Sequence, residues 1–138
     1  RRLQKMLTDH IVLAGFGTTD REAAEELIAR GTPPGQLVVI DCEPDPLAEA
    51  EALGCTILQG DATRDATLQA VRIAEASSLV VTAGRDDTSI LITLTARHLA
   101  PALRISTTIR AEDNELLARQ AGATTVVNPV SFAGLLLA

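Results

Sequence analysis

Short apolar runs alternate along the chain with longer segments that carry apolar side chains at helical spacing. The first runs, at residues 11–14 and 37–40, are apolar at every position and do not alternate with polar residues. Continuous apolar strands are typical of a parallel sheet that helices cover on both faces. The expected strands are centred near Val12, Val38, Ile57, Val80, Ile105 and Val126.

Signals for helices lie between these strands. Thr19 and Glu22 have the spacing of a capping box that opens the first helix, and Asp45 with Pro46 indicates the start of the second. A further helix is expected over residues 112–121. Six strand–helix units predict an α/β fold with a Rossmann-like, doubly wound, parallel six-stranded sheet in strand order 3-2-1-4-5-6.

A glycine turn follows the first strand. Gly15 and Gly17 occupy the first two places of the G-x-G-x-x-G fingerprint, where a pyrophosphate approaches bare backbone at a helix N-terminus. The third place, which lets helix and strand pack closely, holds Asp20. Its carboxylate competes with phosphate for the helix dipole, and Arg21 offsets part of that repulsion. The turn predicts a nucleotide site in outline, weakened or altered by Asp20.

Ligands of such sheets bind beyond the carboxyl ends of the strands, where the strand order reverses. Asp41 closes the second strand, 41 − 20 = 21 residues after the fingerprint, where an acid bonds a ribose 2′-hydroxyl. A turn residue at a strand end is the alternative for Asp41. The candidate cofactor-binding residues at this edge are Gly15, Phe16, Gly17, Thr18, Thr19, Asp41, Cys42, Asp61, Ala62, Thr63, Gly84, Arg85 and Arg110.

The charge distribution argues against a nucleic-acid partner. The formal net charge is −6, and Arg1, Arg2 and Lys5 all precede the first strand. Without these three, 9 basic and 18 acidic side chains leave the folded body at −9. Such a surface repels nucleic-acid phosphates. The basic N-terminal stretch is either a solvated tail or a contact for anionic lipid headgroups.

The chain offers little for catalysis or metal binding. It has no tyrosine and no tryptophan, and Lys5 is its only lysine. Cys42 and Cys55 lack C-x-x-C spacing, and His10 and His98 are isolated, which favours free thiols and structural imidazoles. No apolar run approaches the ~20 residues of a membrane span. We therefore expect one non-catalytic domain.

The motifs resemble the N-terminal lobe of the regulator-of-K⁺-conductance (RCK) domain, also called the Trk-N domain, of prokaryotic potassium channels and transporters. The most specific match is Gly60-Asp61-Ala62-Thr63, which an Ile-x-x-Ala pattern at residues 73–76 follows. The resemblance covers nearly the whole chain from His10, through residues 10–17, 37–41, 58–87, 95–101 and 120–129.

The resemblance implies a division of the chain and roles for individual residues. Residues 1–9 correspond to a linker from a transmembrane pore domain, residues 10–129 to the Rossmann-like lobe, and residues 130–138 to the start of a crossover helix. By position, Gly15 and Gly17 match the phosphate turn, Asp41 the ribose acid, Asp61 and Ala62 the adenosine contacts, and Arg85 and Arg110 lie in loops that reach phosphates.

The resemblance also implies a function. It indicates a cytoplasmic, ligand-sensing regulatory domain of a potassium channel that binds NAD, NADH or an adenine nucleotide. Such domains form homodimers within an octameric gating ring below the K⁺ pore, here with residues 90–99 and 105–109 as interface candidates. Three alternatives remain open: a regulatory subunit of a K⁺ transporter, the NAD-binding half of an oxidoreductase, and a structural module with an empty pocket.

Overall fold

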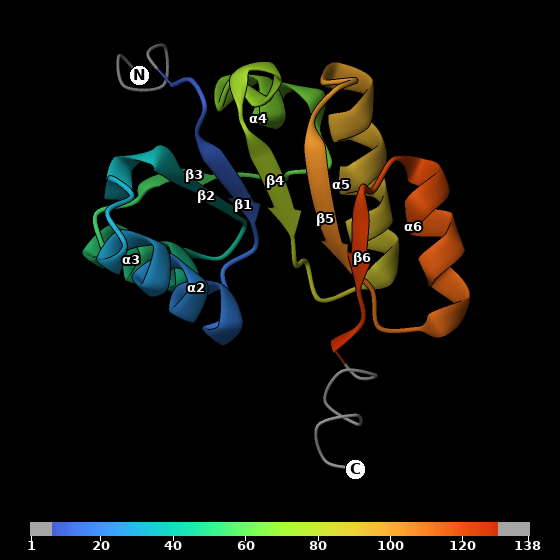
Figure 1. The fold of residues 1–138 in the computed structure, drawn as a ribbon, viewed down its shortest axis with the longest axis horizontal. Coiled ribbons are helices and arrows are strands. Elements are labelled where there is room, and N and C mark those ends of the chain that lie inside the picture. The colour runs from blue at the N-terminus through green and yellow to red at the C-terminus, as the bar shows by residue number, and fades with distance from the viewer. Residues whose placement is uncertain (1–6, 130–138) are drawn as a thin grey trace.

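A six-stranded sheet in which all neighbouring strands are parallel forms the centre of the computed structural model, which describes residues 7–129 (Figure 1). The strand order β3-β2-β1-β4-β5-β6 confirms the predicted topology. The helix expected at residues 130–138 and residues 1–6 of the expected linker lie outside the described residues. The strands are β1 (Ile11–Ala14), β2 (Leu37–Asp41), β3 (Thr56–Gln59), β4 (Ser78–Val81), β5 (Arg104–Thr108) and β6 (Thr125–Val127).

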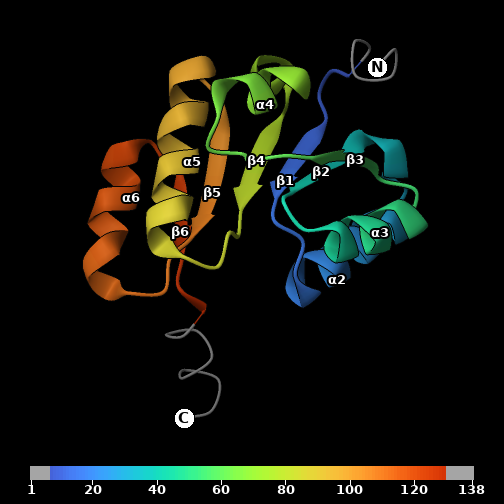
Figure 2. The ribbon, with the colours of Figure 1, turned by 180° about the vertical axis from the view of Figure 1, so that it is seen from behind.

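Helices lie on both faces of the sheet. In Figure 1 strand β5 stands in front of helix α5 (Asp86–Leu99), whereas from behind, in Figure 2, α5 stands in front of β5. The helices are α2 (Thr18–Ala29), α3 (Pro44–Ala52), α4 (Asp65–Ala70), α5 (Asp86–Leu99) and α6 (Glu115–Ala121), with the short 3₁₀ turns η1 (Pro34–Gln36), η2 (Ile73–Glu75) and η3 (Glu112–Asn114).

Each face of the sheet has its own hydrophobic core. Val38 and Ile40 of β2 join a core with Leu68 of α4 and Ile92 of α5. Their strand neighbours Leu37 and Val39 join a second core with residues of α2 and α3. All four β2 side chains are at most 1% exposed. Burial on both faces explains why the apolar run in β2 does not alternate.

Two helices begin earlier than the sequence predicted. The Thr19/Glu22 capping box does not form, because α2 already begins at Thr18 with Gly17 as its cap residue. The carboxylate that reaches back to the cap is Asp20, which accepts the Gly17 N–H at 3.0 Å. Helix α3 begins at Pro44 rather than Pro46, since Pro44 sets the backbone φ that a first helical residue needs.

The region predicted as one helix over residues 112–121 consists of the 3₁₀ turn η3 followed by α6. Helix α5 is apolar on more than one side. Ile92 and Ala96 are buried, whereas Leu91 and Leu94 are 48% and 49% exposed. Leu116 on the neighbouring helix α6 is 62% exposed. These leucines leave apolar surface on two helices that pack against each other.

Hydrogen bonds to backbone carbonyls fix residues 7–10, the N-terminal segment, at the amino edge of the sheet. Arg72 Nε donates to the Leu7 carbonyl at 2.9 Å, and Asp9 N–H donates to the Glu75 carbonyl at 2.8 Å. His10 is fully buried, and its Nε2 lies 2.7 Å from the Val71 carbonyl. His10 therefore fits the structural role predicted for it.

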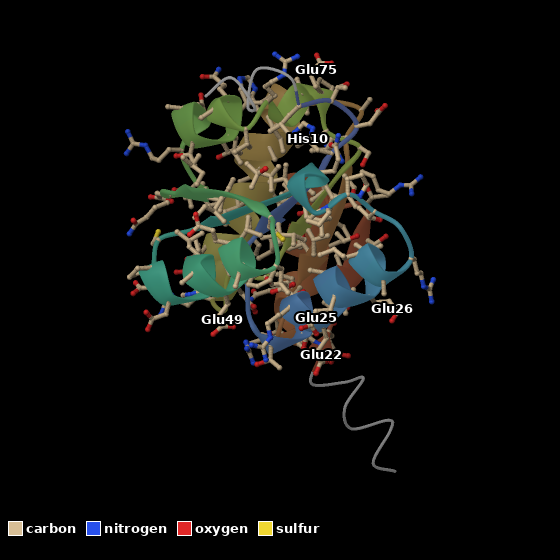
Figure 3. All side chains as sticks on the ribbon, turned by 90° about the vertical axis from the view of Figure 1, so that its left-hand side faces the viewer. His10, Glu22, Glu25, Glu26, Glu49 and Glu75 are labelled. Atoms are coloured by element: carbon tan, nitrogen blue, oxygen red, sulfur yellow. The ribbon has the colours of Figure 1, made fainter. Side chains whose placement is uncertain are left out.

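Acidic side chains cover the outer surface of α2 and α3. Figure 3 shows Glu22, Glu25 and Glu26 along α2, with Glu49 on α3 beside them. Ion pairs with Arg21 and Arg30 engage Glu49 and Glu26. Among the described residues, no helix combines the length and apolar character needed to cross a bilayer.

Candidate nucleotide-binding site

A pocket of about 420 Å³ lies at the carboxyl edge of the sheet, where the strand order reverses between β1 and β4. Loops that follow parallel strands diverge at such a reversal and leave a crevice between them. The lining combines the loops after β1, β2, β3 and β4 with the start of α5: Ala14, Gly15, Phe16, Gly17, Ile40, Asp41, Cys42, Glu43, Pro46, Gly60, Ala62, Thr82, Ala83, Thr88 and Ile92.

The two glycines of the turn differ in their physical role. Gly15 has φ +109°, and a Cβ there would lie 2.5 Å from the Thr82 carbonyl oxygen, so only glycine fits. Gly17 has an ordinary φ of −83°, and a Cβ there would meet only Asp20 Oδ2, at 3.9 Å. The first glycine is thus required by the approach of the β4 loop, and the second leaves open space on the pocket side.

Asp20 is buried beside this turn, with 8% of its surface exposed. Its Oδ2 accepts two hydrogen bonds, from Gly17 N–H at 3.0 Å and from the Thr82 hydroxyl at 2.6 Å. Burial raises the pKa of Asp20, and the nearby charge of Asp41 adds to that rise, while the bonds from Thr82 and Gly17 oppose it. Arg21 does not offset the charge as expected, since it pairs with Glu49 at 3.1 Å.

Asp41 stands at the end of β2 on the opposite side of the pocket. Its Oδ1 accepts the Glu43 N–H at 2.9 Å, which makes it the turn residue that the sequence offered as an alternative role. Within the described residues its Oδ2 makes no hydrogen bond and is available to a ligand hydroxyl. The Cys42 thiol donates to the Gly60 carbonyl at 3.3 Å. The β2 and β3 loops are therefore tied together below the pocket.

The charge around Cys42 is negative. Loss of hydration raises the pKa of the Cys42 thiol first, and the carboxylates of Asp61, Asp41 and Glu43 raise it further. Cys42 is exposed and Cys55 is buried, and both are free thiols, as predicted. Among residues 7–129, no group of histidine, cysteine and carboxylate side chains is arranged to hold a metal ion.

The Gly60–Thr63 motif forms a tight turn next to the pocket. Asp61 Oδ1 accepts both the Thr63 N–H at 2.9 Å and the Thr63 hydroxyl at 2.6 Å. These bonds lower the pKa of Asp61. The Thr63 carbonyl in turn accepts the hydroxyl of Thr95 on α5 at 3.1 Å. Ala62 lines the pocket, whereas Asp61 and Thr63 mainly shape the turn.

Arg85 and Arg110 lie outside the pocket. Together with Asp86, Asp87 and Asn114, they line a separate open hollow of about 400 Å³ at the same edge of the sheet. Arg85 makes two hydrogen bonds to Asp87, at 3.1 and 3.0 Å. Gly84 precedes this hollow with φ +90° and is exposed. Arg85, Arg110 and Gly84 therefore do not line the pocket at the glycine turn.

The candidate residues chosen from the sequence left out the part of the pocket that follows β4. Thr82, Ala83 and Thr88 come from the β4 loop and the first turn of α5. Thr82 was findable in principle, because it directly follows the strand that neighbours β1 in the predicted order. Thr18 and Thr19 provide the first N–H groups of α2, which a helix leaves without intrahelical partners.

Comparison with known proteins shows which family the chain belongs to. The TrkA-N domain profile matches residues 11–129. The chain belongs to the TrkA-N domain family. It is 32% identical over 139 residues to probable potassium channel protein 2 of Methanocaldococcus jannaschii, covering 97% of this chain and 39% of that protein. It is 33% identical over 135 residues to a putative K⁺ efflux antiporter, KefB, of Alkalimonas amylolytica, covering 97% and 20% respectively.

A solved structure of the GsuK channel bound to NAD is similar to this TrkA-N domain with a TM-score of 0.86 and 25% identity, covering 96% of this chain and 23% of that one. The chain therefore spans less than half the length of these curated and solved relatives. It is homologous to domains of potassium channel proteins, as the RCK resemblance implied, and K⁺ efflux proteins form the related alternative.

Proposed function

We propose that this TrkA-N domain is a ligand-sensing regulatory domain on the cytoplasmic side of a prokaryotic potassium channel. In this proposal, an adenine nucleotide binds the pocket at the strand reversal and changes the shape of an assembled ring. The observation that carries the proposal is the pocket itself, with a glycine turn on one side and Asp41 on the other. A related channel has been solved with NAD bound.

Each candidate residue has a chemical role in the proposal. The backbone around Gly15, Phe16 and Gly17, with the first N–H groups of α2 at Thr18 and Thr19, faces the end of the ligand that carries phosphate in dinucleotides. Asp41 accepts a ribose hydroxyl. The residues that contact the adenosine side of the ligand are Cys42, Asp61, Ala62 and Thr63. Any phosphates that extend along the edge of the sheet are contacted by Gly84, Arg85 and Arg110.

The domain acts by binding and not by catalysis. Its effect on a gate requires a ligand with different affinities for two ring shapes. A coupling of ~1–3 kcal/mol, repeated over identical subunits, biases such an equilibrium. The pocket lining offers no histidine, lysine or tyrosine for proton transfer.

Thermal unfolding with NAD, NADH, ADP, AMP and adenosine tests the proposal. A ligand at ~100 times its Kd adds ~2.7 kcal/mol of stability, which moves Tm by several degrees. Asp41→Asn retains the Oδ1 acceptor for Glu43 and removes the charge that binds ribose, so the affinity falls ~10–100-fold. Asp113→Asn, on the exposed turn η3, is the matched control. Unchanged Tm with every ligand contradicts the proposal.

We also propose that the domain forms homodimers, and through them an octameric ring, by way of the exposed leucines on α5 and α6. The predicted contribution of strand β5 is corrected, because it is an interior strand and Ile105 and Ile109 are fully buried. Leu94→Asp is expected to shift the solution mass from dimer to monomer, while Ala23→Asp on the exposed side of α2 leaves it unchanged. Equal masses for both variants contradict this interface.

Transporter regulation is the second candidate function, because the 33% identity to an efflux antiporter is close to the 32% identity to a channel protein. The segment encoded ahead of Arg1 distinguishes the two. A pore helix with a selectivity-filter motif supports the channel, and an antiporter core supports the transporter.

A further inference from the structure

The third place of the glycine fingerprint carries a buried carboxylate in this chain. Asp20 is the third residue of α2, and both donors that reach it, Gly17 N–H and the Thr82 hydroxyl, converge on Oδ2. These two bonds lower the pKa of Asp20 and so favour its ionised form, whereas burial raises the pKa. Asp20 thus places an acceptor oxygen, which is negatively charged when the carboxyl group is ionised, directly against the turn.

This arrangement removes what a phosphate group needs at the turn. The Gly17 N–H is among the donors that a pyrophosphate would accept, and Asp20 occupies it at 3.0 Å. A phosphate placed there would also face a like charge in a partly desolvated site, where repulsion is stronger than in water.

No cation in the described lining compensates for this charge. The charged residues that line the pocket are Asp41 and Glu43, both acidic. Arg21, next in sequence to Asp20, is held by Glu49, and Arg85 is held by Asp87 in the separate hollow. The thiol of Cys42 responds to the same acidic surroundings.

The opposite side of the pocket suits an uncharged sugar. Asp41 Oδ2 is free to accept hydroxyl protons, and a ribose carries two hydroxyls on neighbouring carbons that can donate to one carboxylate. Ala14, Ile40, Ala62 and Ile92 supply apolar lining around it. The pocket therefore offers favourable contacts to a nucleoside and unfavourable ones to a phosphate at the turn.

We propose that Asp20 is a specificity-determining residue that excludes phosphate from the glycine turn, so that the pocket selects an uncharged ribonucleoside over a pyrophosphate-containing dinucleotide. This inference rests on the proposed ligand-sensing function of the same pocket and narrows its ligand from adenine nucleotides in general to a ribonucleoside.

Calorimetric titration of the 138-residue chain with adenosine, ADP and NAD tests the inference. The wild type binds adenosine at least tenfold more tightly than NAD, a difference of ~1.4 kcal/mol. Asp20→Gly restores the third glycine and shifts the adenosine-to-NAD affinity ratio by ~10–100-fold towards NAD. Asp20→Asn removes the charge, keeps an acceptor for Gly17, and shifts the ratio in the same direction by less.

Asp65→Gly is the matched control, because Asp65 is also an acid in the first turn of a helix, α4, and does not line the pocket. It is expected to leave the ratio unchanged. Circular dichroism verifies that each variant is folded, and Asp20→Asn carries the test if Asp20→Gly unfolds.

The outcomes separate the two proposals. Binding of adenosine with an equal or greater affinity for NAD in the wild type overturns the role of Asp20 and leaves the nucleotide-sensing function in place. An adenosine-to-NAD affinity ratio that is the same in Asp20→Asn and in the wild type also overturns the role of Asp20 and leaves the sensing function in place. If no probe binds wild type or variants, the proposed function fails and the inference fails with it.

Discussion

The hydroxyl of Thr82 donates to Asp20 Oδ2 at 2.6 Å and thereby joins the loop after β4 to the first turn of α2. The two residues are 62 positions apart and meet where the strand order reverses. Gly15 brings the same loop close from the other side, since its missing side chain lets the Thr82 backbone approach. The glycine turn is consequently held in place by β4 as much as by β1.

Thr82→Val removes this hydroxyl with little change in side-chain shape. Asp20 then keeps a single donor in a buried position, and we expect the free energy of unfolding to fall by about 1–3 kcal/mol at neutral pH. Urea denaturation measures it. Thr125→Val on the exposed edge strand β6 is the control and is expected to change stability by less than about 0.5 kcal/mol.

The same variant has a predictable pH dependence. Because the folded-state pKa of Asp20 lies above its ordinary value of 3.8, Asp20 adds stability below that value and loses it as the pH rises through the raised pKa. Thr82→Val raises the pKa of Asp20 further, since the Thr82 bond lowers it. The stability difference between variant and wild type therefore shrinks on acidification, and a difference independent of pH contradicts an ionised Asp20.

Gly15→Ala tests the close approach at the turn. The residue has φ +109°, and the added Cβ would meet backbone atoms of Thr82 at 2.5 and 3.1 Å, so we expect a loss of about 3 kcal/mol or more. Gly17→Ala is the matched control, with an ordinary φ and open space, and is expected to cost within about 1 kcal/mol. Similar losses for the two variants contradict this difference between the glycines.

Asp86→Asn tests the anchor between α5 and the β5–η3 loop. Asp86 accepts Arg110 N–H and Ala111 N–H, both at 2.9 Å, and the Asn114 side-chain amide at 2.8 Å. An asparagine has one acceptor oxygen in place of two, so we expect a loss of about 1–2 kcal/mol at neutral pH.

The effect of Asp86→Asn disappears in acid. Burial by itself would raise the pKa of Asp86, but the bonds from Arg110, Asn114 and Ala111 together hold it below 3.8. The contribution of Asp86 to the free energy of unfolding is therefore fully present above pH 3.8 and is lost as the pH falls through the lower folded-state pKa. Chemical unfolding at neutral pH and at about pH 2 shows this. A loss that persists undiminished in acid argues against the charged anchor.

Arg97→Met tests the cap shared by α5 and α6. The Arg97 guanidinium donates to the Gly122 carbonyl at 3.1 and 2.7 Å, and to the carbonyls of Ala100 at 3.0 Å and Pro101 at 2.8 Å. Methionine keeps the apolar stem and removes these charged donors, so we expect a loss of about 2–3 kcal/mol. Arg104→Met, at an exposed position of β5, is expected to leave the urea midpoint unchanged.

Strands β1 and β2 were predictable because burial on both faces leaves a local signature, the unbroken apolar run. The strand order was predictable from the repeated strand–helix units and the glycine turn after the first strand. The position of Asp41 at the pocket was predictable, since its distance from the glycine turn is set by one strand–helix–strand unit. The bond between Asp20 and Thr82 was not, because nothing near Asp20 in sequence indicates which loop it meets.

The positions of Arg85 and Arg110 also could not be predicted from the neighbouring sequence. Arg85 and Arg110 follow strands at the correct edge, yet their placement depends on which acids hold them. Asp87 takes the Arg85 guanidinium, and Asp86 binds the backbone at Arg110 and so fixes its loop. Position along the chain predicted the edge of the sheet, and side-chain pairing decided which hollow each residue lines.

The N-terminal segment at residues 7–10 gives β1 a mechanical role. This strand of four residues, about 13 Å long, joins the fixed amino edge to the glycine turn at the carboxyl edge. It is bonded along its length to β2 and to β4, so it cannot slide without breaking both ladders together. A force applied at Leu7 is therefore shared between the anchors of the N-terminal segment and these two ladders, which are loaded in shear along β1 towards the pocket.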